Sequence, residues 1–276
     1  MNSIQKLLPA AVAALTLALA AALPARAAPV TECATIGICY CINSDFKPII
    51  DDQVSKLRAM IAAERAKGKA IGYLSVPLST GGGGVFSVNR EVAERTGRRV
   101  EARMGASHVW MLVPGMKEAD IPNAGSARAG GGEYMVMWTR ILEGPSGFGD
   151  DFDFFYFTGP SDFAAYFGLT GSGDMDRIAA FYADRIKTDA ELQRAVEQGR
   201  VSPTTFRNYY GLRASTTVSL GAHDEWNIAG KINSRRRENS KFGSNNQLPV
   251  FFDGRPVSGA EAESPVSNGY AGACKP

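Results

Sequence analysis

Three short apolar runs, separated by glycine-containing turns and helix-length amphipathic segments, constrain the fold of this 276-residue chain most strongly. The runs are residues 70–78, 107–113 and 151–157. Spacing of apolar residues at three and four positions predicts a helix at 47–67, before the first run, and another at 88–104, after it. Because strands that alternate with helices pair in parallel, this order predicts an α/β fold built on a parallel sheet.

The pattern continues less regularly toward the C-terminus. Helices are predicted at 133–142 and 175–198, and a long loop rich in Ala, Gly, Asn and Pro at 117–132. Residues 204–220 combine helix and strand signals, and the chain beyond them is a less regular extension. We find no internal repeat and no second-domain boundary, so a single main domain is expected.

The first 28 residues have the organisation of a secretory signal peptide. Lys6 is followed by an almost unbroken apolar run at 7–23 and by a small-x-small sequence at 25–27. An uncleaved membrane anchor is the alternative, but the run is short for a span of about 20 residues. We therefore expect a secreted or periplasmic protein whose mature chain has no membrane span.

The mature chain divides by composition into three parts. A cysteine-containing segment at 29–44 precedes the α/β domain, expected at 45–230, and a polar tail at 231–276 is expected to pack on that domain. All four cysteines lie in the two flanking segments: Cys33, Cys39, Cys41 and Cys274. We expect Cys274 to form a disulfide with one member of the N-terminal cluster, and a Cys39–Cys41 bridge is the least favourable pairing. A metal site is the alternative, but the cluster lacks a C-x-x-C pair and a nearby histidine, so none is expected.

Net charge excludes one class of function. Residues 1–28 contain two basic residues and no acid, so the remaining basic residues equal the 28 acidic residues. A general nucleic-acid binder needs excess Lys and Arg to face phosphates. We therefore expect no general nucleic-acid binding and look instead for a small-molecule site.

The loops after the three predicted strands are the expected location of that site, because ligands of open parallel sheets bind beyond the carboxyl ends of the strands. The first such loop includes Ser75 and four consecutive glycines. Backbone N–H groups at Gly82 and Gly83 could cradle a phosphate, although a flexible turn is the alternative. The run does not match a G-x-G-x-x-G fingerprint or a P-loop, so no nucleotide cofactor is expected.

Glu133 follows three glycines and begins a predicted helix beside this edge of the sheet. A carboxylate in that position could act as nucleophile or as acid and base. Alternatively, an acidic residue in the first turn only stabilises the helix dipole.

Residues 132–144, followed by 151–160, resemble the nucleoside 2-deoxyribosyltransferase pattern of a glycine loop, a glutamate that begins a helix, and a strand. Residues 71–77 resemble the first strand of that family, and 107–115 the strand before its catalytic loop. Three glycines stand where the family has Asp-Gly-Thr. Over about residues 70–160, the resemblance implies a three-layer flavodoxin-like sheet flanked by helices, and chemistry at an N-glycosidic bond.

Carried over by position, the resemblance makes Glu133 the carboxylate that attacks or stabilises the anomeric carbon, and Tyr73 the residue that orients it. Asp120 or Asn123 would contact sugar hydroxyls. Together with the glycine loop considered above, the other substrate-binding residues expected in these loops are Ser75, Gly82, Gly83 and Gly132.

These observations predict an N-glycosidic-bond enzyme, secreted or periplasmic, that acts on a nucleoside or nucleotide. An oxocarbenium-like transition state next to a carboxylate is the chemical basis of that prediction. A noncatalytic ligand-binding or interaction protein that keeps the sheet is the alternative. A secreted NAD glycohydrolase is a third possibility, since it breaks a comparable bond.

Two polar features further along the chain have no assigned role. His223, Asp224 and Glu225 are followed by Trp226 and Asn227, and this group could form part of a second site or a lid. Three consecutive arginines at 235–237 could bind phosphate or an acidic partner, but a solvated loop is the simpler interpretation.

Overall fold

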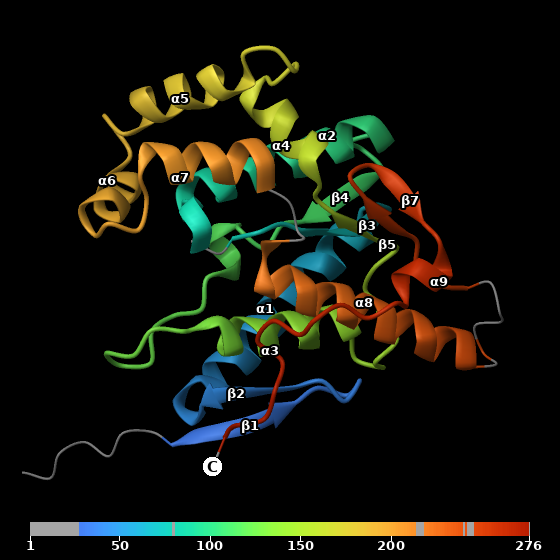
Figure 1. Ribbon diagram of the computed structural model, residues 1–276. Coiled ribbons are helices and arrows are strands. Elements are labelled where there is room, and N and C mark those ends of the chain that lie inside the picture. The colour runs from blue at the N-terminus through green and yellow to red at the C-terminus, as the bar shows by residue number, and fades with distance from the viewer. Residues whose placement is uncertain (1–27, 79–80, 214–217, 240, 242–245, 276) are drawn as a thin grey trace, which may run out of the picture.

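The computed structural model describes residues 28–78, 81–213, 218–239, 241 and 246–275 (Figure 1). Its main sheet has the strand order β4-β3-β5-β6-β7. The first four strands in that order pair in parallel, and β7 is antiparallel to β6. Their bounds are β3 (Ala70–Ser75), β4 (Val109–Leu112), β5 (Phe154–Phe157), β6 (Val250–Phe252) and β7 (Arg255–Val257). The predicted α/β class is confirmed.

Helices cover both faces of this sheet, which explains why its strands are apolar along their whole length. Consecutive side chains of a strand point to opposite faces. Tyr73 and Phe155 therefore belong to one buried core, whereas Leu74 and Phe154 belong to the other.

The helices divide between the two cores. One face packs against α1 (Lys47–Ala66), α3 (Gly131–Glu143) and α8 (Leu220–Glu238). The core on the other face includes residues of α2 (Phe86–Met104), α4 (Pro160–Phe167), α5 (Asp174–Arg185), α6 (Ala190–Glu197) and α7 (Pro203–Asn208). Shorter elements are the 3-10 turns Ser44–Phe46, Gly81–Gly83 and Lys117–Ala119, the π-helix Tyr209–Arg213, and α9 (Gly259–Ala262).

The single helix predicted at 175–198 is wrong, because the chain breaks it into α5 and α6. Asp189 is the N-cap of α6, and its side chain accepts hydrogen bonds from the backbone N–H groups of Glu191 and Leu192. A capping carboxylate satisfies N–H groups that have no partner within the helix, so it starts a new helix where the apolar periodicity alone suggests continuation.

The C-terminal part is also more regular than predicted. The expected boundary at residue 230 falls inside α8, and β6 lies in the main sheet beside β5. The described residues after 230 are therefore an integral part of the fold as well as a covering tail. Within the described part of 204–220, the structure has α7 and a π-helix and no strand.

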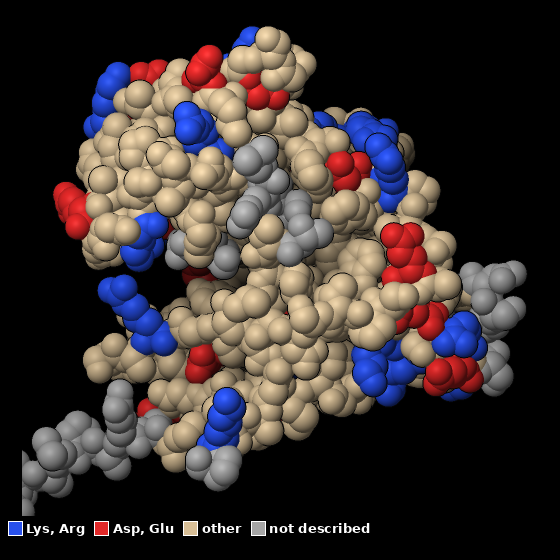
Figure 2. All heavy atoms as spheres, viewed as in Figure 1, with Lys and Arg blue, Asp and Glu red and all other residues tan. Residues whose placement is uncertain are grey.

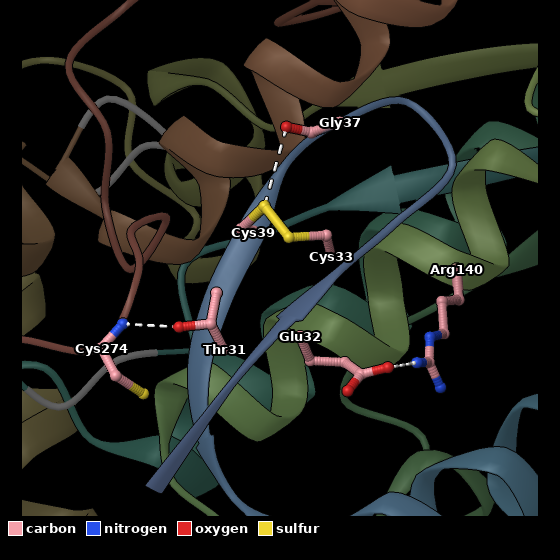
Figure 3. Close-up of a disulfide and its surroundings, with 7 residues drawn as sticks. All are labelled: Thr31, Glu32, Cys33, Gly37, Cys39, Arg140 and Cys274. Atoms are coloured by element: carbon pink, nitrogen blue, oxygen red, sulfur yellow. Dashed lines mark hydrogen bonds and ion pairs between the residues drawn. A yellow bond between two sulfur atoms is a disulfide. The ribbon is translucent and has the colours of Figure 1, made fainter.

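A small hairpin precedes the α/β domain. Its strands, β1 (Pro29–Cys33) and β2 (Cys39–Asn43), pair antiparallel and place Cys33 opposite Cys39. These two cysteines form one disulfide, drawn in Figure 3. Cys41 and Cys274 form the other, so the predicted bond between Cys274 and the N-terminal cluster is confirmed.

Within the described residues, no helix is both long enough and apolar enough to cross a membrane. The predicted signal peptide at 1–28 lies outside the described residues except for Ala28.

Candidate active site

The direction of the chain connections reverses between β3 and β5. From β3 the chain crosses to β4 on one side, and then returns to β5 on the other. Loops that leave neighbouring strands in opposite directions leave a crevice at their carboxyl ends. Ser75 is the last residue of β3 and is fully buried at this point.

A cavity of about 270 Å³ lies at this end of the sheet, between the loops after β3 and β4, the beginning of α3 and the first turns of α8. Figure 2 shows the surface hollowed at the left, between the α6–α7 end of the helical layer and the loop of residues 117–130. That loop contributes Asp120 and Ala129 to the cavity. The aromatic side chains that line it are Phe86, Tyr134, Trp138 and Tyr270.

Glu225 is the buried carboxyl group of this cavity. It belongs to α8, lines the cavity and is only 5% exposed. The Tyr73 hydroxyl donates a 2.7 Å hydrogen bond to its Oε1, and the Ser75 hydroxyl donates to its Oε2. Two hydroxyl donors from β3 thus fix both carboxyl oxygens of Glu225, which lies on α8.

The pKa of Glu225 is raised to about 7, chiefly because the group is buried and, to a lesser extent, because the charge of Asp224 lies close by. Hydrogen bonds from Ser75 and Tyr73 act in the opposite direction, because they stabilise the carboxylate. Tyr73 stays a neutral donor, since burial and the charge of Glu225 hold its pKa well above the usual value. Glu225 therefore exists in both protonation states near neutral pH, as a general acid and base requires.

Tyr73 and Trp138 form an aromatic support behind the carboxyl group. Their ring centroids are 5.6 Å apart, and Tyr73 also makes an edge contact with Phe152 at 6.0 Å. Such packing fixes the ring, so the direction of the Tyr73 hydroxyl is set by the core. The Tyr73–Glu225 pair is accordingly held by a strand and a helix.

Glu133 has different surroundings. Its Oε2 accepts a 2.9 Å hydrogen bond from the backbone N–H of Gly130, and its Oε1 accepts a 2.8 Å bond from the backbone N–H of Asn43. The carboxylate thus closes the first turn of α3 and ties the hairpin to it. The hydroxyl of Tyr73, which the resemblance assigned to orienting Glu133, donates its hydrogen bond to Glu225 instead.

Of the other predicted substrate-binding residues, the structure brings Asp120 to the cavity and places Ser75 against Glu225. Asn123 is exposed and is not among the residues that line the cavity. Gly132 packs against the hairpin, where an added Cβ would lie 2.5 Å from the carbonyl oxygen of Cys41.

The two glycines of the first loop are explained by backbone conformation and, at Gly83, by packing as well. At Gly83, which has φ +108°, an added Cβ would lie 2.3 Å from the carbonyl oxygen of Thr205. Gly82 also has a positive φ, of 70°. Neither lines the cavity, so the structure gives Gly83 a role in the close approach of α7.

Glu225 is the functional candidate that the sequence motifs did not single out. Its only signal was the polar group His223–Glu225 within an otherwise unassigned segment. In the structure, these side chains point in different directions from α8. Glu225 points to the sheet, whereas Nδ1 of the half-buried His223 lies 3.1 Å from the Ser267 hydroxyl. Within the described residues, no group of three or more acidic, His or Cys side chains is placed to hold a metal ion.

Comparisons of the chain with protein-family models, with curated proteins and with solved structures find no match.

Proposed function

We propose that this protein is an N-glycosidic-bond enzyme of nucleosides or nucleotides, in which Glu225 is the catalytic acid. The observation that carries the proposal is the buried Glu225 carboxyl group, which is held by Tyr73 and Ser75 in an aromatic-lined cavity at the carboxyl edge of the sheet. A pocket with a few convergent polar groups and a perturbed carboxyl group is the usual form of an active site.

The proposed reaction is hydrolysis. Protonated Glu225 donates its proton to the nitrogen of the leaving base while the bond between that nitrogen and the anomeric carbon breaks, and the electron pair leaves with the base. Water then adds to the oxocarbenium-like carbon and returns a proton to Glu225. Asp120, the second carboxyl side chain of the cavity, is proposed to contact the sugar hydroxyls.

The sheet order supports the finer fold proposal. Strands β4-β3-β5-β6 follow the parallel order 2-1-3-4 of flavodoxin-like sheets, and β7 takes the next position in antiparallel direction. Gly130 and Gly131, at the beginning of α3, lie in the cavity wall, which supports the proposed likeness to nucleoside 2-deoxyribosyltransferases. The catalytic carboxylate, however, is proposed on α8 instead of α3.

Export from the cytoplasm is part of the proposal. Two disulfides join all four cysteines, and structural disulfides persist mainly in oxidising compartments. We therefore propose a secreted or periplasmic location.

The test compares two glutamates that are both buried near this edge of the sheet. Base release is measured from a panel of ribonucleosides, deoxyribonucleosides and NAD, with the oxidised chain and with its Glu225→Gln and Glu133→Gln variants. Loss of a general acid lowers the rate by about 100-fold or more, so E225Q should be inactive while E133Q stays active. Loss of activity in E133Q alone would instead support the residue that the sequence resemblance implied.

A noncatalytic ligand-binding protein is the second candidate. The observation that favours it is that Tyr73 and Ser75 already bond both oxygens of Glu225, as they would in a purely structural network. If calorimetry shows that the parent chain binds a nucleoside but no base is released, this second candidate is supported.

A further inference from the structure

Residues near the C-terminus form part of the wall of the candidate site. We call residues 264–275 the C-terminal strap; it runs along α8 and ends at the hairpin (Figure 1). Near its start, the Asn227 side chain bonds the backbone N–H and carbonyl of Val266. Near its end, the backbone N–H of Cys274 donates to the Thr31 hydroxyl at 2.9 Å, as Figure 3 shows. The Cys41–Cys274 disulfide ties it covalently to β2.

Asp224 fixes the middle of the strap. Its carboxylate is 1% exposed and accepts hydrogen bonds from the backbone N–H groups of Gly269, Tyr270 and Ala271, at 2.7 to 3.1 Å. A buried carboxylate that accepts three backbone N–H groups holds those three residues in one conformation. Asp224 precedes Glu225 on α8, so the same helical turn presents the acid to the cavity and anchors the strap beside it.

The Tyr270 ring is the part of the strap that reaches the cavity. The ring lies directly on Gly131 at the beginning of α3, where an added Cβ would be 2.2 Å from a ring carbon. It lines the same cavity as Glu225. Yet 39% of the residue stays exposed, among the few large hydrophobic side chains of the described chain that are this open. An aromatic ring that is rigidly anchored and left open at a cavity wall offers a face for a planar ligand.

We propose that Tyr270 is a specificity-determining residue that stacks on the planar base of the substrate. This inference rests on the proposed function. In it, the base stacks against the cavity wall formed by Tyr270, and Glu225 protonates the base as the glycosidic bond breaks. The ligand class that fits is a nucleoside or free base with an aromatic heterocycle. Sugars without such a ring should bind weakly.

The experiment measures binding and turnover separately. Binding of adenosine, uridine and adenine is measured by calorimetry in the E225Q background, which prevents turnover, and base release is measured in the parent background. The variants are Tyr270→Ala, Tyr270→Phe and the control Val266→Ala. Val266 is on the same strap and equally open, at 40%, but does not line this cavity.

Base stacking requires the Tyr270 ring in its place at the cavity wall. We expect Y270A to weaken adenosine binding by about 10- to 100-fold and to raise KM rather than lower kcat. Y270F should stay within about threefold of the parent, and V266A should match the parent. Gly131→Ala, which displaces the ring without removing it, should weaken binding in the same direction as Y270A.

Each outcome separates the two proposals. Ring-dependent binding without base release in the parent supports the role of Tyr270 and contradicts the proposed enzyme. Base release with a KM that Y270A leaves unchanged supports the enzyme and overturns the role of Tyr270. Equal weakening by Y270A and V266A, or no binding of any of the three probes, also overturns it.

Discussion

The Tyr73 hydroxyl donates a 2.7 Å hydrogen bond to Glu225, a residue 152 positions later in the chain. The bond joins the third residue from the end of β3 to a helix that begins only after the insertion of α4 to α7. It holds the carboxyl group at the edge where parallel α/β sheets bind ligands. The proposed chemistry rests on this pair, because the core fixes the donor and Glu225 lines the cavity.

Activity should fall as pH rises through about 7. The pKa of Glu225 is about 7, and a general acid works only while it is protonated. Above that pH we expect kcat/KM to fall by about tenfold per pH unit, as measured between pH 5 and 9. Tyr73→Phe removes a hydrogen bond that lowers this pKa, so it should move the descending limb to higher pH. A limb that stays in place would show that Tyr73 does not position the acid.

Folding stability should decrease as pH rises from about 4.5 to about 7. The pKa of Glu225 lies above its unfolded value near 4.5 and reaches about 7 in the folded chain. The folded state therefore binds more protons than the unfolded state between these values, and stability is lost as pH rises. At 1.4 kcal/mol per unit, this loss is about 3 kcal/mol. Denaturant unfolding at pH 4 and pH 8 measures it, and subtracting the E225Q curve removes the other titrating groups. An identical pH dependence in E225Q contradicts the prediction.

The two disulfides should contribute unequally to stability. Cys41–Cys274 spans 233 positions, whereas Cys33–Cys39 spans 6. Loop-closure entropy predicts a loss of about 5 kcal/mol for the Cys41→Ser, Cys274→Ser double variant and about 2 kcal/mol for Cys33→Ser, Cys39→Ser. Chemical unfolding of both variants under the same oxidising conditions compares them directly. A larger loss for the hairpin disulfide would refute the entropic account.

Removing the Glu133 side chain should weaken the junction between α3 and the hairpin. Glu133→Ala leaves the backbone N–H groups of Gly130 and Asn43 without their carboxylate partner. We expect a loss of about 2 kcal/mol in the free energy of unfolding. Glu197→Ala is the matched control, since Glu197 is exposed at the end of α6, and should change stability by less than about 0.5 kcal/mol. Equal effects of the two substitutions would argue against a capping role.

Local sequence patterns determined the elements of the α/β domain. The helix predicted at 47–67 corresponds to α1, and the three apolar runs contain β3, β4 and β5. These predictions succeed because periodicity and glycine turns are properties of a few consecutive residues. The strand β6 was not predicted, because its three residues are too few to show a periodic pattern.

The cysteine spacing also restricted the ends of the chain. Three clustered cysteines and a distant Cys274 allow few disulfide pairings. A bond between Cys274 and one of the clustered cysteines was therefore predicted from the sequence. Its partner, Cys41, was decided by the hairpin, because the register places Cys33 opposite Cys39 and thereby leaves Cys41 for the strap.

The carboxyl group of the site was decided by tertiary structure alone. In sequence, Glu133 beside its glycines carries a motif, whereas Glu225 is one acid in an unassigned segment. Folding gives Glu133 two backbone N–H partners and gives Glu225 a buried cavity with Tyr73 and Ser75. Burial and long-range hydrogen bonds set the pKa of a carboxyl group, and neither is encoded in its near neighbours. The sequence by itself determined the helices and strands, and only the packing of α8 on β3 decided which carboxyl group faces the cavity.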